Sequence, residues 1–486
     1  MTKNVVFIMI SFMIFSMSYS QSFQERLFIA HEKYVEKSLK NRRIKHADIQ
    51  LLIAKLKTKK GFVVQQLGQS IGGKPIHLIS FGEGKTDVFL WSQMHGNEPT
   101  ATMALFDLLN FFTSEGFEAE KTAILKNVKI HFLPMLNPDG ADLYQRRNLL
   151  GIDINRDALR LQSPEAKILK KVRDSLEADF GFNLHDQSIY YNAYLTPQSA
   201  TISFLAPAYN YEKSINTVRG NAMKIIVLMN QVLQKYIPGG VGRYNDEFEP
   251  RAFGDNIQKW GTSTILIESG GYKTDVEKQF IRKLNFVSIA VAIKSIADKS
   301  YTKINRQLYN TIPNNDRKLF DLKLTGLSYE LEGNKYVLDL GIQRMERNKN
   351  NATDFYYVGS ISDQGDLSTY YGYREVDVSG YLYEAPKVYP EVQSHFNQVL
   401  NLDHKALLKQ GYAYIPVEIL PTAFSDVKFP LHLVSKGFSP PNRLKPGINP
   451  TFFLTKNGVR THAVINGFLI DLNHENTNFK NALILR

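Results

Sequence analysis

The stretch "DVFLWSQMHGNEPTATMALFDLLNFF", Asp87 to Phe112, decides the fold. Its first part, Asp87–Met94, is a continuous apolar run, which is typical of a strand buried on both faces in a parallel sheet. The second part, Pro99–Phe112, reads as a helix, because proline is tolerated at the first helical position. A buried strand joined to a helix by a short polar turn predicts an α/β domain.

The same alternation of strands and helices continues on both sides of this stretch. Upstream, Phe23–Leu56 has helical spacing with few breakers, and "VVQQLGQSIGGKPIHLISFGEG" indicates two short strands around a glycine-rich turn. Downstream, three more apolar runs end in polar or turn residues: "VKIHFLPML", "FGFNLHD" and "TSTILIESGG". We therefore expect an α/β fold around a largely parallel, buried sheet.

Four side chains with acid, base or ligand chemistry stand where the predicted strands end. His95 and Glu98 lie in the turn after the strand of the opening stretch, and His185 and Glu268 each close a downstream run. In open α/β sheets the binding crevice lies outside the carboxyl ends of the strands. We expect these four side chains to meet in one site.

The residue types in this predicted site favour a catalytic zinc ion. Two imidazoles and one carboxylate, from His95, His185 and Glu98, leave a fourth coordination position open for water, as catalytic zinc sites do. Glu268 would then accept a proton from that water. The chain has no cysteine, so a closed structural site built from thiolates is excluded. We expect one zinc ion per chain.

Several ordered motifs resemble one known family. "GQSIGGKPI", "HGNE", "NPDG", "GIDINRD" and "TILIESGG" are similar to those of the zinc carboxypeptidases, peptidase family M14, over about Ala47 to Ala297. The resemblance implies an α/β/α sandwich around a mixed eight-stranded sheet. It also implies that His95, Glu98 and His185 are the zinc ligands, with Glu268 as general base and later as the acid that protonates the leaving amine.

Further functional residues are implied by the same resemblance. Asn155 and Arg156 match the pair that holds the terminal carboxylate of a substrate, a task suited to a guanidinium. Either Arg146 or Arg147 would stabilise the oxyanion, with Arg146 favoured. Tyr244 is the candidate for the tyrosine that the family places over the site, and a tyrosine with no catalytic part is the alternative.

The specificity and the reaction class stay open. Arg251 and Asp255 are candidates for a specificity pocket, although a loop salt bridge or a cap explains them as well. The sequence between Glu98 and His185 is shorter than in digestive relatives, which leaves peptides and cell-wall peptides (muropeptides) as substrate classes. A zinc amidohydrolase or deacylase of small amides, and a non-catalytic peptide-binding or glycan-binding relative, are the rival functions.

The N-terminal residues indicate export. Residues 1–20 combine one lysine, an apolar run from Val5 to Met17 and small residues at the end, which predicts a signal peptide. The run is short for a membrane span of about 20 residues, so we expect no membrane span and a secreted, periplasmic or extracellular protein. The formal net charge of +12 is spread thinly, and we expect no nucleic-acid partner.

The character of the chain changes after about residue 300. Residues 301–318 are polar and rich in breakers, which predicts a linker after a catalytic domain of residues 21–300. Residues 319–486 contain short aromatic and β-branched runs, interrupted by one expected helix at about Ser394–Gln410. They predict a β-rich accessory domain. We expect a purely structural role for this domain. The alternative is that its tyrosines form a face that binds glycans weakly. Its role and the oligomeric state do not follow from the sequence.

Overall fold

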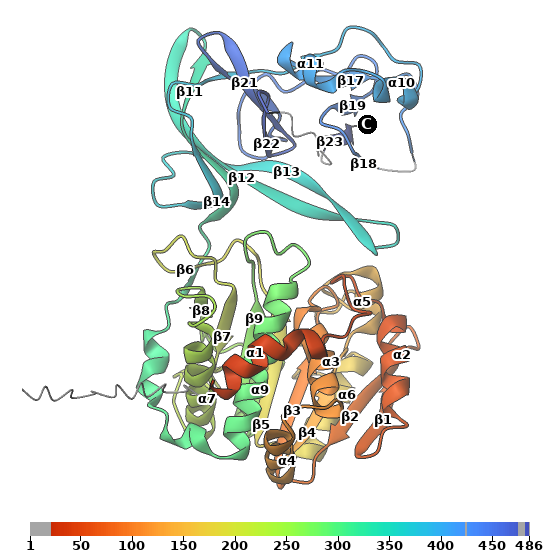
Figure 1. Ribbon diagram of the computed structural model, residues 1–486, viewed down its shortest axis with the longest axis vertical. Helices are drawn as coiled ribbons and strands as arrows, with labels where there is room; N and C mark the ends of the chain where they lie inside the picture. Colours follow the sequence, from red (N-terminus) through yellow and green to blue (C-terminus); the bar gives the residue numbers. More distant parts are fainter. Residues whose placement is uncertain (1–20, 423–424, 475–481, 486) are drawn as a thin grey trace, which may run out of the picture.

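The computed structural model describes residues 21–422, 425–474 and 482–485, so the predicted signal peptide lies outside the described residues. An α/β domain occupies the N-terminal part of the chain, and a β-rich domain lies above it in Figure 1. Within the described ranges, no helix is both long and apolar enough to span a membrane.

An eight-stranded mixed sheet forms the centre of the α/β domain. Four of its seven neighbouring strand pairs are parallel, namely β3 with β4, β3 with β5, β5 with β9, and β7 with β8. The expected α/β fold with a mixed, largely parallel sheet is therefore confirmed. The strands, in their order across the sheet, are β1 (Phe62–Gln69), β2 (Pro75–Phe81), β4 (Val128–Leu133), β3 (Thr86–Ser92), β5 (Phe180–Asp186), β9 (Ser263–Ser269), β7 (Ile202–Leu205) and β8 (Val241–Arg243).

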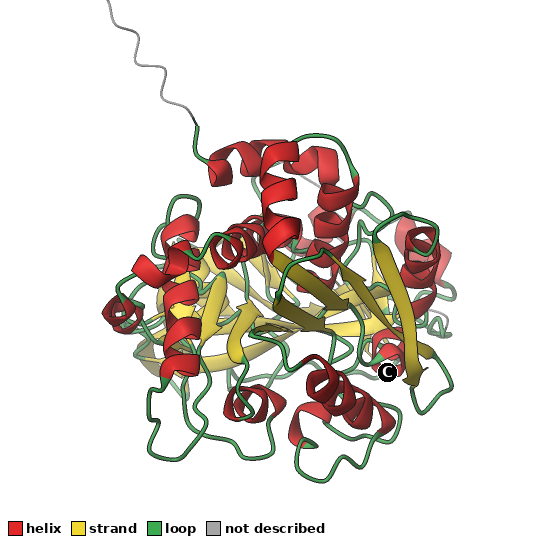
Figure 2. Cartoon of the chain, turned by 90° about the horizontal axis from the view of Figure 1, so that it is seen from below, coloured by secondary structure: helices red, strands yellow, loops and turns green. Residues whose placement is uncertain are grey.

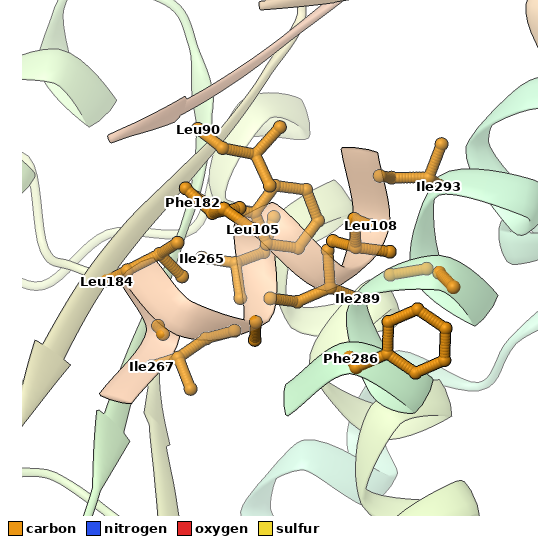
Figure 3. Close-up of a cluster of buried hydrophobic side chains, with 14 of the residues drawn as sticks. Leu90, Leu105, Leu108, Phe182, Leu184, Ile265, Ile267, Phe286, Ile289 and Ile293 are labelled. Carbon is orange, nitrogen blue, oxygen red and sulfur yellow. The ribbon is translucent and has the colours of Figure 1, made fainter. Parts of the chain in front are cut away.

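Helices cover both faces of this sheet, as the view in Figure 2 shows. The larger core lies on one face, where α3 and α9 pack on the central strands. Leu105 of α3 and Ile289 of α9 meet Phe182 of β5 there (Figure 3), and all three are fully buried. Burying one such side chain contributes about 1.5–3 kcal/mol. The helices on this face are α1 (Phe23–Tyr34), α2 (His46–Leu56), α3 (Thr100–Thr113), α4 (Glu118–Asn127), α7 (Thr217–Leu233) and α9 (Gln279–Ala297).

A smaller core lies on the opposite face of the sheet. Trp91 of β3 is fully buried there, beside residues of α6 (Pro164–Leu176) and α8 (Phe253–Lys259). The remaining short elements of the domain are α5 (Pro138–Leu143), the 3₁₀ helix η1 (Ile154–Arg156) and β6 (Asn192–Ala193). The central strands are thus buried on both faces, which explains their continuous apolar sequences.

Residues 301–318, which the sequence predicts to be a linker, pack on the α/β domain. Tyr309 and Ile312 are buried in its larger core, and the Tyr309 hydroxyl accepts a hydrogen bond from Ala206 N at 3.1 Å. Because the segment is mostly polar, its composition does not indicate that these two apolar side chains are buried. Its elements are η2 (Ser300–Lys303), η3 (Arg306–Thr311) and β10 (Asn315–Asp316), and β10 pairs with β6.

The C-terminal part is rich in strands, as expected, and contains two sheets with separate cores. The expected helix at Ser394–Gln410 is two short helices, because the Asp403 side chain accepts a hydrogen bond from Ala406 N and starts a second one. The first sheet contains β11 (Leu319–Leu331), β12 (Asn334–Lys349), β13 (Asp354–Gly365), β14 (Tyr371–Asp377), β15 (Leu382–Glu384), β20 (Phe452–Lys456), β21 (Val459–Ile465) and β22 (Phe468–Asp471). The second contains β16 (Lys387–Val388), β17 (Tyr412–Pro416), β18 (Asp426–Val427), β19 (His432–Val434) and β23 (Ala482–Leu485), and the helices are α10 (Phe396–Leu400) and α11 (His404–Lys409).

The long hairpin of β12 and β13 joins the two domains. It lies along the top of the α/β domain in Figure 1, with its tip at the side of α5. Glu346 on β12 forms ion pairs with Arg42 and Arg43 of the α/β domain. Asn348 Nδ2 donates a hydrogen bond to the carbonyl of Leu143, the last residue of α5, at 3.1 Å. The accessory domain is thus held at the end of the sheet where the predicted site lies.

Candidate metal centre and active site

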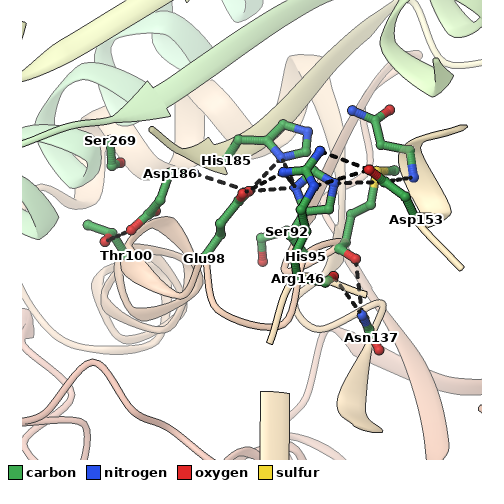
Figure 4. Close-up of polar contacts among 12 residues, drawn as sticks. Ser92, His95, Glu98, Thr100, Asn137, Arg146, Asp153, His185, Asp186 and Ser269 are labelled. Atoms are coloured by element: carbon green, nitrogen blue, oxygen red, sulfur yellow. Dashed lines mark hydrogen bonds and ion pairs between the residues drawn. The ribbon is translucent and has the colours of Figure 1, made fainter. Parts of the chain in front are cut away.

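The structure brings His95, Glu98 and His185 together at the carboxyl ends of β3 and β5. The two Nδ1 atoms lie 3.1 Å apart, and Glu98 Oε2 lies 2.9 Å from the first and 2.7 Å from the second (Figure 4). All three side chains are buried. Among the described residues, this is the group of His, Asp and Glu that could hold a metal ion.

The donor atoms of this group suit a zinc ion. Ligand atoms at about 2.0–2.1 Å from zinc in a tetrahedron lie roughly 3.3 Å from one another, close to the separations seen here. Two imidazole nitrogens that face each other cannot both donate a proton to the other, so a cation between them satisfies both lone pairs. Three ligands converge from the described part of the chain, which leaves room for a water or substrate oxygen in the coordination sphere.

Asp153 orients one of the ligands and is the site residue that the sequence reasoning missed. His95 Nε2 lies 3.1 Å from Asp153 Oδ1 (Figure 4), so the ring presents Nδ1 to the other two ligands. A carboxylate on the outer nitrogen is a common support for a metal-bound imidazole. The acid stands directly before "INRD" in the sequence, and this position inside a family motif was the available signal.

The protonation states of Glu98 and His185 favour metal binding, whereas the nearby Glu98 and Asp153 outweigh burial and raise the pKa of His95, so a metal ion would displace a proton there. Burial favours a neutral Glu98, but the nearby His95 and His185 outweigh burial and hold the pKa of that carboxyl well below its usual range. Burial lowers the pKa of His185, so its imidazole stays neutral at pH 7. An ionised carboxylate and a neutral imidazole are the forms that coordinate zinc.

Two glycines of the motifs bring the ligand turn into place. A side chain at Gly96, the residue between His95 and Asn97, would put its Cβ 2.0 Å from the backbone carbon of Gly140. Gly140 belongs to "NPDG", where the Asn137 side chain accepts a hydrogen bond from its N–H at 2.9 Å. Gly96 is therefore needed because the two backbones touch, and Gly140 because a Cβ there would lie 2.5 Å from Asn137 Nδ2.

Glu268 lies beside the ligands on the neighbouring strand. Its Cα is the in-register partner of the His185 Cα in the parallel pair of β5 and β9. Burial raises the pKa of Glu268 well above its usual value, and the charges of Glu98 and Asp186 raise it further. A half-buried carboxyl with a raised pKa next to a metal group is suited to accept and return a proton.

The two candidate arginines point in different directions. Arg146 Nη1 lies 3.1 Å from His95 Nδ1 and 3.3 Å from Glu98 Oε1. Its guanidinium also pairs with Asp153 at 3.0 Å. Arg147 instead donates to the carbonyl of Gly151 at 2.9 Å and is exposed. The structure therefore places Arg146 at the metal group and Arg147 away from it.

Tyr244 is also placed near the metal group. Its ring packs edge-on against Tyr191, with centroids 5.7 Å apart. Burial raises the pKa of the Tyr244 hydroxyl, and the neighbouring charge of Glu268 raises it further. The hydroxyl therefore stays protonated at neutral pH and is available as a hydrogen-bond donor.

Asn155 and Arg156, the residues expected to hold the substrate carboxylate, form the other side of the site and are called the carboxylate clamp below. The Asn155 side chain accepts a hydrogen bond from Phe253 N at 3.0 Å, and the backbone N–H of Asn155 donates to Asp153 Oδ1 at 3.0 Å. Arg156 lies half-exposed, with Nε 3.5 Å from Glu249. Arg251 also pairs with Glu249, at 3.0 Å, so the loop salt bridge that the sequence offered as an alternative is present.

Asp255 lies under this clamp. It is 9% exposed and accepts a hydrogen bond from Glu249 N at 3.0 Å. Burial raises the pKa of the Asp255 carboxyl to about 7. It is thus a buried acid whose charge changes near neutral pH.

Comparison with known proteins gives the same family as the motifs. Residues 49–179 match the family model described as zinc carboxypeptidase, a range that includes His95 and Glu98 and ends before His185. Carboxypeptidase SOL1 of Arabidopsis thaliana is 29% identical over 176 residues, which are 30% of this chain and 35% of that protein. Carboxypeptidase E of Caenorhabditis elegans is 33% identical over 119 residues, 20% of this chain and 25% of that protein.

A solved structure of a metallo-carboxypeptidase from Burkholderia cenocepacia aligns with a TM-score of 0.43 and 16% identity, covering 52% of this chain and 69% of that chain. The matched region spans about a third of the length of the first curated relatives, 35% and 37%. The resemblance carried by the motifs is confirmed by the family match, and through its N-terminal α/β domain this chain is related to the zinc carboxypeptidases.

Proposed function

We propose that the chain is an exported zinc-dependent metallocarboxypeptidase that removes residues from the C-terminus of peptides or cell-wall peptides. The observation that carries this proposal is the group of His95, Glu98 and His185 with Glu268 in register beside it. The family match over residues 49–179 supports the activity class. Export is supported by the sequence of residues 1–20 alone.

The reaction follows from the chemistry of these groups. A bound zinc ion supplies a Lewis acid and lowers the pKa of water to about 7. Glu268 takes a proton from the attacking water and returns it to the leaving amine, which its raised pKa allows. The Arg146 guanidinium lies at the ligands, where it can donate to the carbonyl oxygen as negative charge develops.

The direction of attack depends on the clamp. Asn155 and Arg156 lie next to Asp153, and a planar guanidinium binds a carboxylate with two parallel hydrogen bonds. A deacylase of small amides has no use for such a pair, which favours the carboxypeptidase over that alternative. Glu249 keeps Arg156 in position by an ion pair, and a substrate carboxylate would compete with it for the guanidinium.

The test uses the zinc-loaded mature protein with matched peptides and muropeptides that carry a free or an amidated C-terminus. Single residues should be released from the free end, and amidation should abolish most turnover. Arg156→Ala should lower turnover of the peptide with a free C-terminus. The difference in turnover between the free and the amidated peptide should therefore become smaller. Equal rates on free and amidated substrates in the parent would favour an amidohydrolase or an endopeptidase instead.

A further inference from the structure

A groove between the two domains begins at the metal group. Its first part is a cavity of about 530 Å³ lined by Asn97 and Glu98 on one side and by β12 of the accessory domain on the other. A second cavity of about 330 Å³ continues between the 271–276 loop and Arg374 of β14. The two share Arg42, Lys278 and Arg344 among their walls, so they adjoin. Each is large enough to hold a ligand.

The walls of this groove carry more positive than negative charge. Its acids are already engaged, because Glu98 belongs to the metal group, Asp186 pairs with Lys278, and Asp321 pairs with Arg344. Glu346 is shared by two arginines, and Asp275 accepts three backbone N–H groups at the start of α9. Three cations of the groove form no ion pair with the described residues: Lys273, Arg347 and Arg374.

Three arginines of the groove are held in place by packing. The Nε atoms of Arg42, Arg43 and Arg344 are buried and have no hydrogen-bond partner among the described residues. These guanidiniums pack over aromatic rings, Arg42 over Phe355, Arg43 over Tyr144 and Arg344 over Phe468, which holds their positive charge at the wall of the groove. Arg42 and Arg43 are only 8% and 6% exposed, so their positions are set by packing rather than by solvent.

The groove leaves the metal group on the side away from the carboxylate clamp. Figure 4 shows Asp153 and Asp186 on opposite sides of the three ligands. Asn155 and Arg156 follow Asp153, whereas Asp186 and the residues after it line the groove. A peptide with its C-terminal carboxylate in the clamp would therefore extend its upstream residues into the groove.

We propose that this interdomain groove binds the upstream segment of the substrate and selects peptides with acidic side chains there. The inference rests on the proposed carboxypeptidase function and assigns a specificity role to the accessory domain, which supplies Arg344, Arg347 and Arg374. A substrate too short to extend beyond the metal group would not contact the groove. An acidic segment would reach the unpaired cations Lys273, Arg347 and Arg374.

The test compares peptides that share one C-terminal dipeptide. The upstream segment carries glutamate, serine or lysine pairs, and a blocked dipeptide without that segment serves as the reference substrate. With zinc-loaded protein, kcat/KM relative to the dipeptide should be higher for glutamate than for lysine, mainly through KM. One exposed ion pair changes affinity by about threefold to fivefold, so Arg347→Glu should lower the glutamate-to-lysine ratio by at least that factor.

Lys335→Glu is the matched control. It reverses a charge on the same strand, β12, at the opposite end and outside the groove, and Lys335 is exposed without an ion pair among the described residues. It should leave the ratio unchanged. A glutamate-to-lysine ratio near one in the parent overturns the inference while leaving the carboxypeptidase function standing. An elevated ratio that Arg347→Glu does not lower also overturns it.

Absence of cleavage of all these substrates would instead refute the proposed function. Binding of the fluorescently labelled glutamate peptide to the zinc-loaded protein then decides the inference. Weaker binding to Arg347→Glu than to Lys335→Glu supports the groove, and equal binding overturns it. If a sulfated glycan displaces the labelled peptide at a lower concentration than the unlabelled peptide does, the groove prefers a glycan. That result overturns the inference that it binds a peptide.

Discussion

His185 and Glu268 are in-register partners across the parallel strands β5 and β9, so one metal ligand and the proposed base lie side by side on one face of the sheet. Neighbouring strands lie about 4.8 Å apart, a distance that lets a carboxylate reach a water held beside the imidazole. The backbone ladder fixes this relation, because a slip by one residue would turn either side chain to the other face.

The first prediction separates the base from the ligands. Glu268→Gln keeps the shape of the side chain and removes the proton acceptor, so zinc content and melting temperature should stay near those of the parent. Turnover should fall by about 10²–10⁴-fold or more, since Glu268 serves as both base and acid. Turnover, bound zinc and melting temperature are measured on the same preparation. A loss below tenfold with zinc intact would mean that another residue is the base.

The second prediction concerns the support of the ligand His95. Asp153→Asn removes the carboxylate that accepts from His95 Nε2, so zinc affinity should fall by about 10–100-fold. Competition with a chelator measures this change. His185→Ala serves as the reference variant and should lose the metal altogether, with little effect on the fold because the sheet has its own core. Unchanged zinc affinity in Asp153→Asn would show that this carboxylate does not support the ligand.

The third prediction uses the two adjacent arginines as a matched pair. Arg146→Ala should lower kcat by roughly 10²-fold or more with little change in KM, because its guanidinium lies at the metal group and acts on charge that develops during the reaction. Arg147→Ala should leave kcat within about twofold, since the Arg147 side chain donates to the carbonyl of Gly151 and forms no other hydrogen bond or ion pair with the described residues. Steady-state kinetics on one free-carboxylate peptide measures both. Similar losses in both variants would contradict the assignment to Arg146.

The fourth prediction concerns stability against pH. The pKa of Asp255 is raised to about 7 in the folded protein, against about 3.9 in an unfolded chain. Between these values the folded state holds a proton that the unfolded state has released, so this carboxyl lowers stability as the pH rises from about 4 to about 7. Above pH 7, this carboxyl lowers the free energy of unfolding by at most about 4 kcal/mol.

Asp255→Asn should remove this loss, because the amide keeps the oxygen that accepts from Glu249 N and carries no charge. Relative to the parent, the variant should be more stable at pH 8 than at pH 5. Urea midpoints of both proteins at the two pH values measure the difference. The same stability difference at both pH values would show that Asp255 titrates normally.

Local sequence patterns determined the α/β class and the position of the ligands. The apolar run of β3 followed by a proline-led helix needs no distant partner to be recognised, because strand and helix periodicity is a local property. His95, Glu98, His185 and Glu268 were found from their places at strand ends, which a parallel sheet brings to one edge.

Tertiary structure alone decided which neighbouring side chains enter the site. Arg146 and Arg147 are adjacent and chemically alike, so only the path of the chain after α5 turns one toward His95 and the other toward Gly151. Asp153 became a partner of His95 through a contact across 58 residues of sequence. Tyr309, in the segment expected to be a linker, is buried by distant residues of the α/β core.

The groove depends on tertiary structure for the same reason. Arg347 reads in the sequence as one more exposed cation of a β-rich domain. It lines the groove because its hairpin is attached to the α/β domain, in part by the ion pairs of Glu346 with Arg42 and Arg43 more than 300 residues earlier. Contacts between residues so far apart in the sequence depend on how two folded domains pack. Local periodicity does not encode that packing. The sequence by itself therefore determined the chemistry of the metal centre, and the packing of the domains decided what surrounds it.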